Sequence, residues 1–168
     1  MLELPADDTR PQRVLLHSRS DIVPAVLEIL RRARREVRCL HHDLSVFDLS
    51  QTGTTEALHA FLHGSPYAHV RLLLDETNWL ETHAARLRLL QRQLAHAIEI
   101  RRAITDDPVG DDTALIADAA HVLVLSRSPH AVGEIWFNSE PRAQPLVTAF
   151  DRRWEAGAHN LPVVPLGL

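Results

Sequence analysis

The chain has 168 residues, of which 45% are hydrophobic and 24% are charged, and its formal net charge at pH 7 is −4. This length predicts one globular domain with a sizeable core, and the single cysteine, Cys39, excludes a disulfide within the chain and a cysteine-based zinc cluster. All 18 residues counted as Lys or Arg are arginine, which excludes any chemistry that requires a lysine, such as a Schiff base or a P-loop.

The predicted elements begin with an arm, a strand and a helix. Residues 1–12 lack hydrophobic periodicity and include Pro5 and Pro11, which favours a flexible N-terminal arm. A short apolar strand, 14–16, precedes a helix that Ser20 or Asp21 can cap, and the apolar residues of this helix recur every three or four positions. Arginines crowd its end within 31–35, where the helix dipole favours positive charge.

The middle of the chain predicts two further strands, each followed by a helix. A strand over 37–40 leads into a polar loop, and a helix then begins at Thr54 or Thr55 and ends at Gly64. Residues 69–75 are almost continuously apolar, which is typical of a strand covered on both faces. The spacing of apolar residues after it predicts one long helix over about 77–95.

The last part predicts four strands, one helix and a tail. The strands cover 97–102, 113–117, 121–125 and 133–137, the helix covers 141–156, and 158–168 form an extended tail. Because only three residues separate the second and third of these strands, we expect an antiparallel hairpin there. The sequence therefore predicts a single α/β domain over 13–157, with a mainly parallel sheet that carries an antiparallel hairpin and is flanked by helices.

The apolar runs are too short for a membrane helix, which needs roughly 20 residues. No stretch resembles an export signal, so we expect a cytoplasmic protein without membrane insertion.

Histidines and acidic residues are the candidates for chemistry. His41 and His42 follow a strand end, where a role in proton transfer or phosphate contact competes with a structural role in the loop. His59 and His63 share a helix face but have no third ligand, so a solvated pair is the favoured interpretation. An acidic loop lacks EF-hand spacing and is interpreted as a solvated turn. We therefore predict neither a metal nor a cofactor. The acidic loop contains Asp106, Asp107, Asp111 and Asp112.

Four segments resemble one unit of the phospholipase D-like superfamily, which includes small bacterial endonucleases. They are AVLEILRRARREVRCL, HVRLLLDE, TALIADAAHVLVL and GEIWFNSEPRAQPLVTAFDRRWE. In the last of them, a strand bearing Glu134 and a turn with Asn138 and Pro141 lead into a helix that contains Phe150 and Trp154. This resemblance implies a phospholipase D-like fold over most of the chain.

The catalytic signature of that superfamily is His-x-Lys, followed after four more residues by Asp. In the window DDTALIAD, Asp111 stands at the histidine position and Thr113 at the lysine position, and only Asp118 matches. An aspartate adds like charge opposite a phosphodiester and a threonine supplies no cation, so the hydrolytic mechanism is not expected to carry over. No residue is assigned a catalytic role. The candidate cleft residues are Asp111, Thr113, Asp118, Glu134, Asn138, His41 and His42.

Three functions are consistent with this sequence. The first is a non-catalytic binding or regulatory domain with an unidentified ligand or protein partner. The second is a hydrolase with replaced chemistry, in which His41 or His42 is the base and acidic residues hold a metal. The third is a nucleic-acid-binding remnant of a nuclease that uses 31–35, Arg101 and Arg102, against which the acidic net charge counts. The resemblance also implies a homodimer, because members with one signature pair two units.

Overall fold

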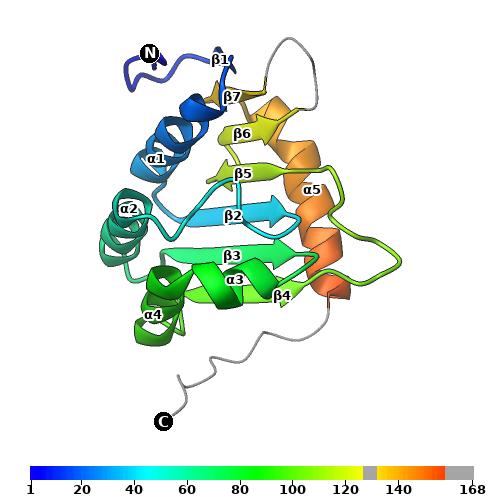
Figure 1. Ribbon diagram of the computed structural model, residues 1–168. Helices are drawn as coiled ribbons and strands as arrows, with labels where there is room; N and C mark the ends of the chain where they lie inside the picture. Colours follow the sequence, from blue (N-terminus) through cyan, green and yellow to red (C-terminus); the bar gives the residue numbers. More distant parts are fainter. Residues whose placement is uncertain (127–131, 158–168) are drawn as a thin grey trace.

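The computed structural model describes residues 1–126 and 132–157 (Figure 1). Within these ranges, seven strands form one sheet in the order β1-β7-β6-β5-β2-β3-β4. The predicted tail, 158–168, lies outside the described residues. The strands are β1 (Gln12–Leu16), β2 (Glu36–His41), β3 (His69–Leu74), β4 (Ile98–Arg102), β5 (Ala114–Ala117), β6 (His121–Leu125) and β7 (Gly133–Phe137).

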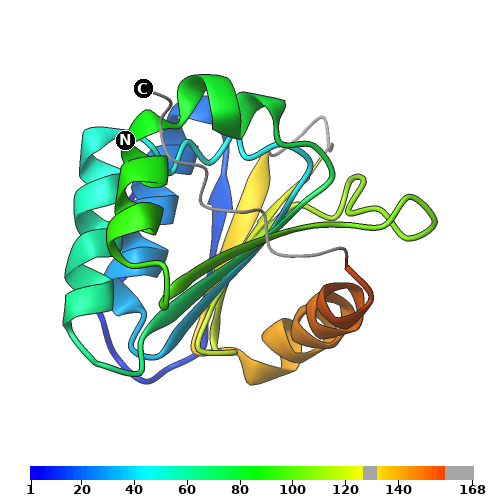
Figure 2. The same cartoon turned by 90° about the horizontal axis from the view of Figure 1, so that it is seen from below.

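Helices cover both faces of the sheet. Figure 2 shows α1, α2 and α4 on one face and α5 on the other. None of the helices among the described residues is long and apolar enough to span a membrane. The helices are the 3-10 helix η1 (Arg19–Asp21) and the α-helices α1 (Ile22–Arg32), α2 (Thr52–His63), α3 (Asn78–His83), α4 (Ala85–Gln93) and α5 (Glu140–Ala156).

The sheet is mixed, which confirms the predicted fold class, but its parallel part is smaller than expected. Among the seven described strands, only β2, β3 and β4 pair in parallel. The hairpin of β5 and β6 is confirmed, and β7 and β1 continue it with antiparallel pairs, while β5 also pairs antiparallel with β2. The expectation of a mainly parallel sheet is wrong because it took the βαβ alternation of the first half to extend across the whole sheet, whereas the second half is built from short connections between antiparallel strands.

The predicted helix over 77–95 is two helices, α3 and α4. They are separated at Ala84, whose backbone adopts φ −102° and ψ 44°. Alanine has the highest helix propensity, so this residue does not break a helix by itself. Ala84 is fully buried in the core, and the break is therefore set by tertiary packing.

The N-terminal segment packs on the body, in contrast to the flexible arm that its composition predicts. Leu2 and Leu4 contact the core, and a guanidinium N–H of Arg32 donates to the carbonyl of Pro5 at 2.8 Å. The amide of Asn138, a residue at φ 51°, donates to the carbonyls of two residues of the segment. Contacts with residues more than 100 positions away hold the segment beside β1 and β7 (Figure 1).

The turn between β5 and β6 is joined to the connection between α1 and β2 by one carboxylate. Asp118, at φ 54°, accepts hydrogen bonds from the backbone N–H groups of Arg34 (2.7 Å), Arg35 (2.8 Å) and Glu36 (2.9 Å). Asp118 therefore has a structural role, because its hydrogen bonds hold β5 in place beside β2.

We expect Asp118→Ala to lower the free energy of unfolding by about 2 kcal/mol or more, because three backbone donors lose an ionised acceptor. Urea unfolding checks this value. The matched control is Asp106→Ala, which removes an exposed loop carboxylate. An equal loss in both variants would contradict the structural role of Asp118.

Candidate functional site

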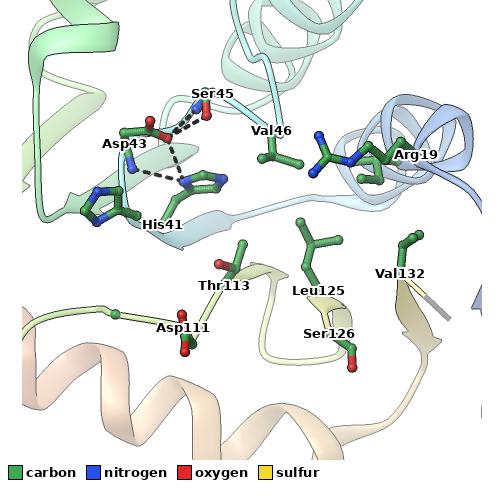
Figure 3. A pocket seen from close by; sticks show the side chains of 13 residues that line it. Arg19, His41, Asp43, Ser45, Val46, Asp111, Thr113, Leu125, Ser126 and Val132 are labelled. Carbon is green, nitrogen blue, oxygen red and sulfur yellow. Dashed lines mark hydrogen bonds and ion pairs between the residues drawn. The ribbon is translucent and has the colours of Figure 1, made fainter. Parts of the chain in front are cut away.

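A cavity of about 590 Å³ lies at the sheet edge where β2 and β6 end and β5 and β7 begin. Figure 3 shows its labelled side chains converging from several elements. Arg19 comes from η1, His41 ends β2, Thr113 precedes β5, and Leu125 ends β6. Because η1 and β2 are far in sequence from the hairpin of β5 and β6, the cavity exists only after the sheet has formed. The lining residues are Arg19, Ile22, His41, His42, Asp43, Ser45, Val46, Gly110, Asp111, Thr113, Leu125, Ser126 and Val132.

His41 is the most buried polar residue of this lining, with 3% of its surface exposed. Its Nδ1 accepts hydrogen bonds from the backbone N–H groups of Asp43 (3.1 Å) and Leu44 (2.8 Å). The tight turn that provides these donors holds Leu44 in the left-handed region at φ 75°, and the ring packs edge-on against Phe47. Burial lowers the pKa of His41 to about 4, so the ring is neutral at pH 7.

These contacts assign the tautomer of His41. Since Nδ1 accepts two hydrogen bonds, the single proton of the neutral ring lies on Nε2. A protonated Nε2 can neither bind a metal nor take a proton from a substrate. In this arrangement His41 is a hydrogen-bond donor toward the cavity.

His42 lies at the rim of the cavity and is half exposed. Its Nδ1 is 3.1 Å from Oδ2 of Asp75, and this hydrogen bond raises the pKa of His42. The same carboxylate accepts the backbone N–H groups of Val109 (2.7 Å) and Gly110 (2.9 Å). Asp75 thus orients the His42 ring and fastens the loop that leads to Asp111 onto the end of β3.

Two of the three positions that the sequence analysis aligned with the signature line the cavity. Asp111 and Thr113 lie side by side there, with the N–H of Thr113 donating to the carbonyl of Asp111 at 2.8 Å. Asp118 lies at the other end of β5, in the turn described above. The four predicted residues that the structure brings together are therefore His41, His42, Asp111 and Thr113.

Glu134 and Asn138, also predicted as cleft residues, do not line this cavity. Glu134 accepts hydrogen bonds from Arg13, Trp136 (2.9 Å) and Arg142 (2.9 Å). Asn138 lies beyond the end of β7, where it holds the N-terminal segment. The sequence pattern identified their elements but not the direction of the side chains, because alternate residues of a strand point to opposite faces.

The other candidate patterns form no centre of their own. His59 and His63 stack at 4.0 Å on α2, and within 1–126 and 132–157 no group of three or more His, Cys, Asp or Glu residues could hold a metal. In the acidic loop, Asp107 and Asp112 pair with Arg153, which fastens the loop to α5.

Sequence reasoning missed Arg19 and Asp75 as residues of the site. Both come shortly after the end of a strand, and His42 does the same. This position in the sequence was the feature that could have indicated a functional residue. The signal was ambiguous because the pairing of β1 with β7, which brings Arg19 to this edge, joins segments about 120 residues apart.

Residues 18–162 match the family described as "Domain of unknown function (DUF7931)". No curated protein sequence matches the chain.

Solved structures share the fold at low sequence identity. TrmBL2, an archaeal chromatin protein, is 17% identical over 92% of this chain with a TM-score of 0.65, and the chain spans 55% of its length. Nuc from Salmonella typhimurium, a phospholipase D family member, is 16% identical with a TM-score of 0.61, covering 90% of this chain and 99% of Nuc. NucT from Helicobacter pylori is 10% identical with a TM-score of 0.57, covering 89% and 98%. The chain therefore has a phospholipase D-like fold.

Because His41 is buried, we expect the free energy of unfolding to depend on pH. Well above pH 6.5 the ring is neutral in both states, whereas between pH 6.5 and about 4 the ring is mostly protonated in the unfolded chain and mostly neutral in the folded chain. Stability should therefore fall as the pH is lowered through this window, with a contribution from His41 of roughly 3 kcal/mol.

Urea unfolding at several pH values checks this prediction against His41→Asn. The Asn side-chain oxygen can replace Nδ1 as the acceptor, and the residue does not titrate. A pH dependence in the variant as steep as in the unsubstituted protein would contradict the assignment.

Proposed function

The chain belongs to the DUF7931 family, and from this premise and its phospholipase D-like fold we propose that it is a non-catalytic binding domain whose phosphodiesterase centre has been replaced by a ligand cavity. The observation that supports this proposal best is the placement of Asp111 and Thr113. They stand at the histidine and lysine positions of the signature, and both line the cavity. On this alignment the histidine and the lysine of the signature are absent from the cavity, and Arg19 is a cation of a different kind within it.

The remaining histidines give little support to replaced chemistry. His41 carries its proton on Nε2 and has no free lone pair, so it serves neither as nucleophile nor as base. His42 is oriented by Asp75, as a general base would be, but it lies at the exposed rim. It is therefore the residue on which the hydrolase alternative depends.

Nucleic-acid binding is supported by the likeness to TrmBL2, an archaeal chromatin protein whose structure shows a novel mode of DNA binding. Several arginines proposed for this role have other partners in the chain. Arg31 and Arg32 pair with Glu28, and Arg101 donates to the carbonyl of Trp154. These contacts and the net charge of −4 favour the ligand cavity over a phosphate-binding surface.

We expect no hydrolysis of bis(p-nitrophenyl) phosphate above the rate in buffer, because the cavity has neither the nucleophile nor the lysine of the signature. Release of p-nitrophenol, measured with and without added magnesium or manganese, checks this expectation. His42→Ala and His59→Ala are assayed in parallel, since His59 is exposed on α2 and outside the cavity. Turnover that His42→Ala abolishes and His59→Ala preserves would establish the hydrolase alternative instead.

A further inference from the structure

The cavity contains a buried donor that has no acceptor among the described residues. Nε2 of His41 is inaccessible to solvent and makes no hydrogen bond, although its tautomer requires a proton there. Buried donors in folded proteins are almost always paired with protein or water. In Figure 3 Asp43 contacts one ring nitrogen of His41, and the other nitrogen points away from Asp43 toward the cavity. An acceptor is therefore missing at a defined point of the cavity.

A cation stands across the cavity from this donor. Arg19 and His41 extend from opposite sides toward the middle of the cavity (Figure 3). Within residues 1–126 and 132–157, the guanidinium of Arg19 makes no ion pair, unlike Arg13, Arg31 and Arg32. A neutral donor and an unpaired cation together fit an acceptor group with negative charge.

The wall between these two polar groups is apolar. It is formed by side chains from α1, the loop after β2, the end of β6 and the residue before β7, and the cavity volume of about 590 Å³ exceeds what a small inorganic ion fills. A ligand that occupies this space must carry an apolar body beside its charged group. The apolar lining residues are Ile22, Val46, Leu125 and Val132.

We propose that the cavity binds a small organic monocarboxylate with an apolar body. The guanidinium of Arg19 balances the charge, and one carboxylate oxygen accepts from Nε2–H of His41 after a small movement of the ring or the wall exposes this buried nitrogen. This inference rests on the proposed function and names its ligand class. The apolar body packs on the wall formed by Ile22, Val46 and Leu125, as a hydrocarbon chain or an aromatic ring does.

Charge selects a carboxylate over a phosphate in this cavity. Asp43 lines the same space, so inorganic phosphate, which carries between one and two negative charges at pH 7, meets more repulsion there than a carboxylate meets. The N–H and the hydroxyl of Ser45 donate hydrogen bonds to Oδ1 of Asp43, and these bonds stabilise the ionised carboxylate. Asp43 thus disfavours inorganic phosphate more than it disfavours a carboxylate, which carries a single negative charge.

The test is a titration of the ¹⁵N-histidine-labelled protein followed by NMR, with benzoate, phenylacetate and hexanoate as ligands. Benzyl alcohol supplies the apolar body without charge, and inorganic phosphate supplies charge without the body. We expect at least one carboxylate to saturate a shift of the Nε2 signal of His41. We expect weaker binding of the alcohol and no saturable shift with phosphate.

The variants Arg19→Gln and His41→Asn should each weaken carboxylate binding at least tenfold, measured by calorimetry for both variants. Arg86→Gln, at an exposed position on α4, is the matched control and should bind as the unsubstituted protein does. Circular dichroism establishes that each variant is folded.

Failure of all three carboxylates to shift His41, or tighter binding of phosphate, would overturn this inference. Equal binding by Arg19→Gln and the unsubstituted protein would also overturn it. These results are independent of the hydrolysis assay, because a protein that cleaves no phosphodiester and binds no carboxylate refutes only the ligand class. A protein that cleaves the diester refutes the proposed function itself.

Discussion

The antiparallel pairing of β2 with β5 is the constraint on which the rest of the structure depends. It joins the parallel strands β2, β3 and β4 to the antiparallel strands β5, β6, β7 and β1 in one sheet. Leu40 lies opposite Ala114, so the residues that follow and precede them, His41 and Thr113, meet at the same edge. One register thereby brings a residue of the first half of the chain to the signature window of the second half. A shift of this register by one residue would turn the lining side chains to the other face of the sheet.

Two carboxylates hold the loops at the two ends of this junction. Asp118 gathers three backbone N–H groups at the end away from the cavity, and Asp75 gathers two at the cavity end while it orients His42. The carboxylate of Asp118 thus holds backbone groups, whereas Asp111 and Thr113 line the cavity.

Several arginines of this chain, which has no lysine, pack their guanidinium groups against aromatic rings. The guanidinium of Arg32 lies 3.8 Å from the ring centroid of Phe137, and that of Arg101 lies 4.4 Å from the ring centroid of Trp154. A planar guanidinium can stack on a ring and still donate hydrogen bonds at its edge, which a lysine ammonium cannot do. Much of the positive charge is therefore part of the packing on both faces of the sheet, and Arg19 at the cavity stands out as a different use of the same residue type.

The sequence by itself determined the local elements. Hydrophobic periodicity placed β6 and β7 at their observed bounds, placed α5 to within one residue, and predicted the hairpin, because these features depend on side chains a few positions apart. It also placed His41 and His42 at a strand end, and the resemblance to the phospholipase D-like superfamily singled out Asp111 and Thr113. Only the tertiary structure decided that these four line one cavity with Arg19, that Glu134 and Asn138 do not, and that the N-terminal segment packs on the body. The physical reason is that strand order, register and the direction of a side chain arise from contacts between distant segments, which no local pattern encodes.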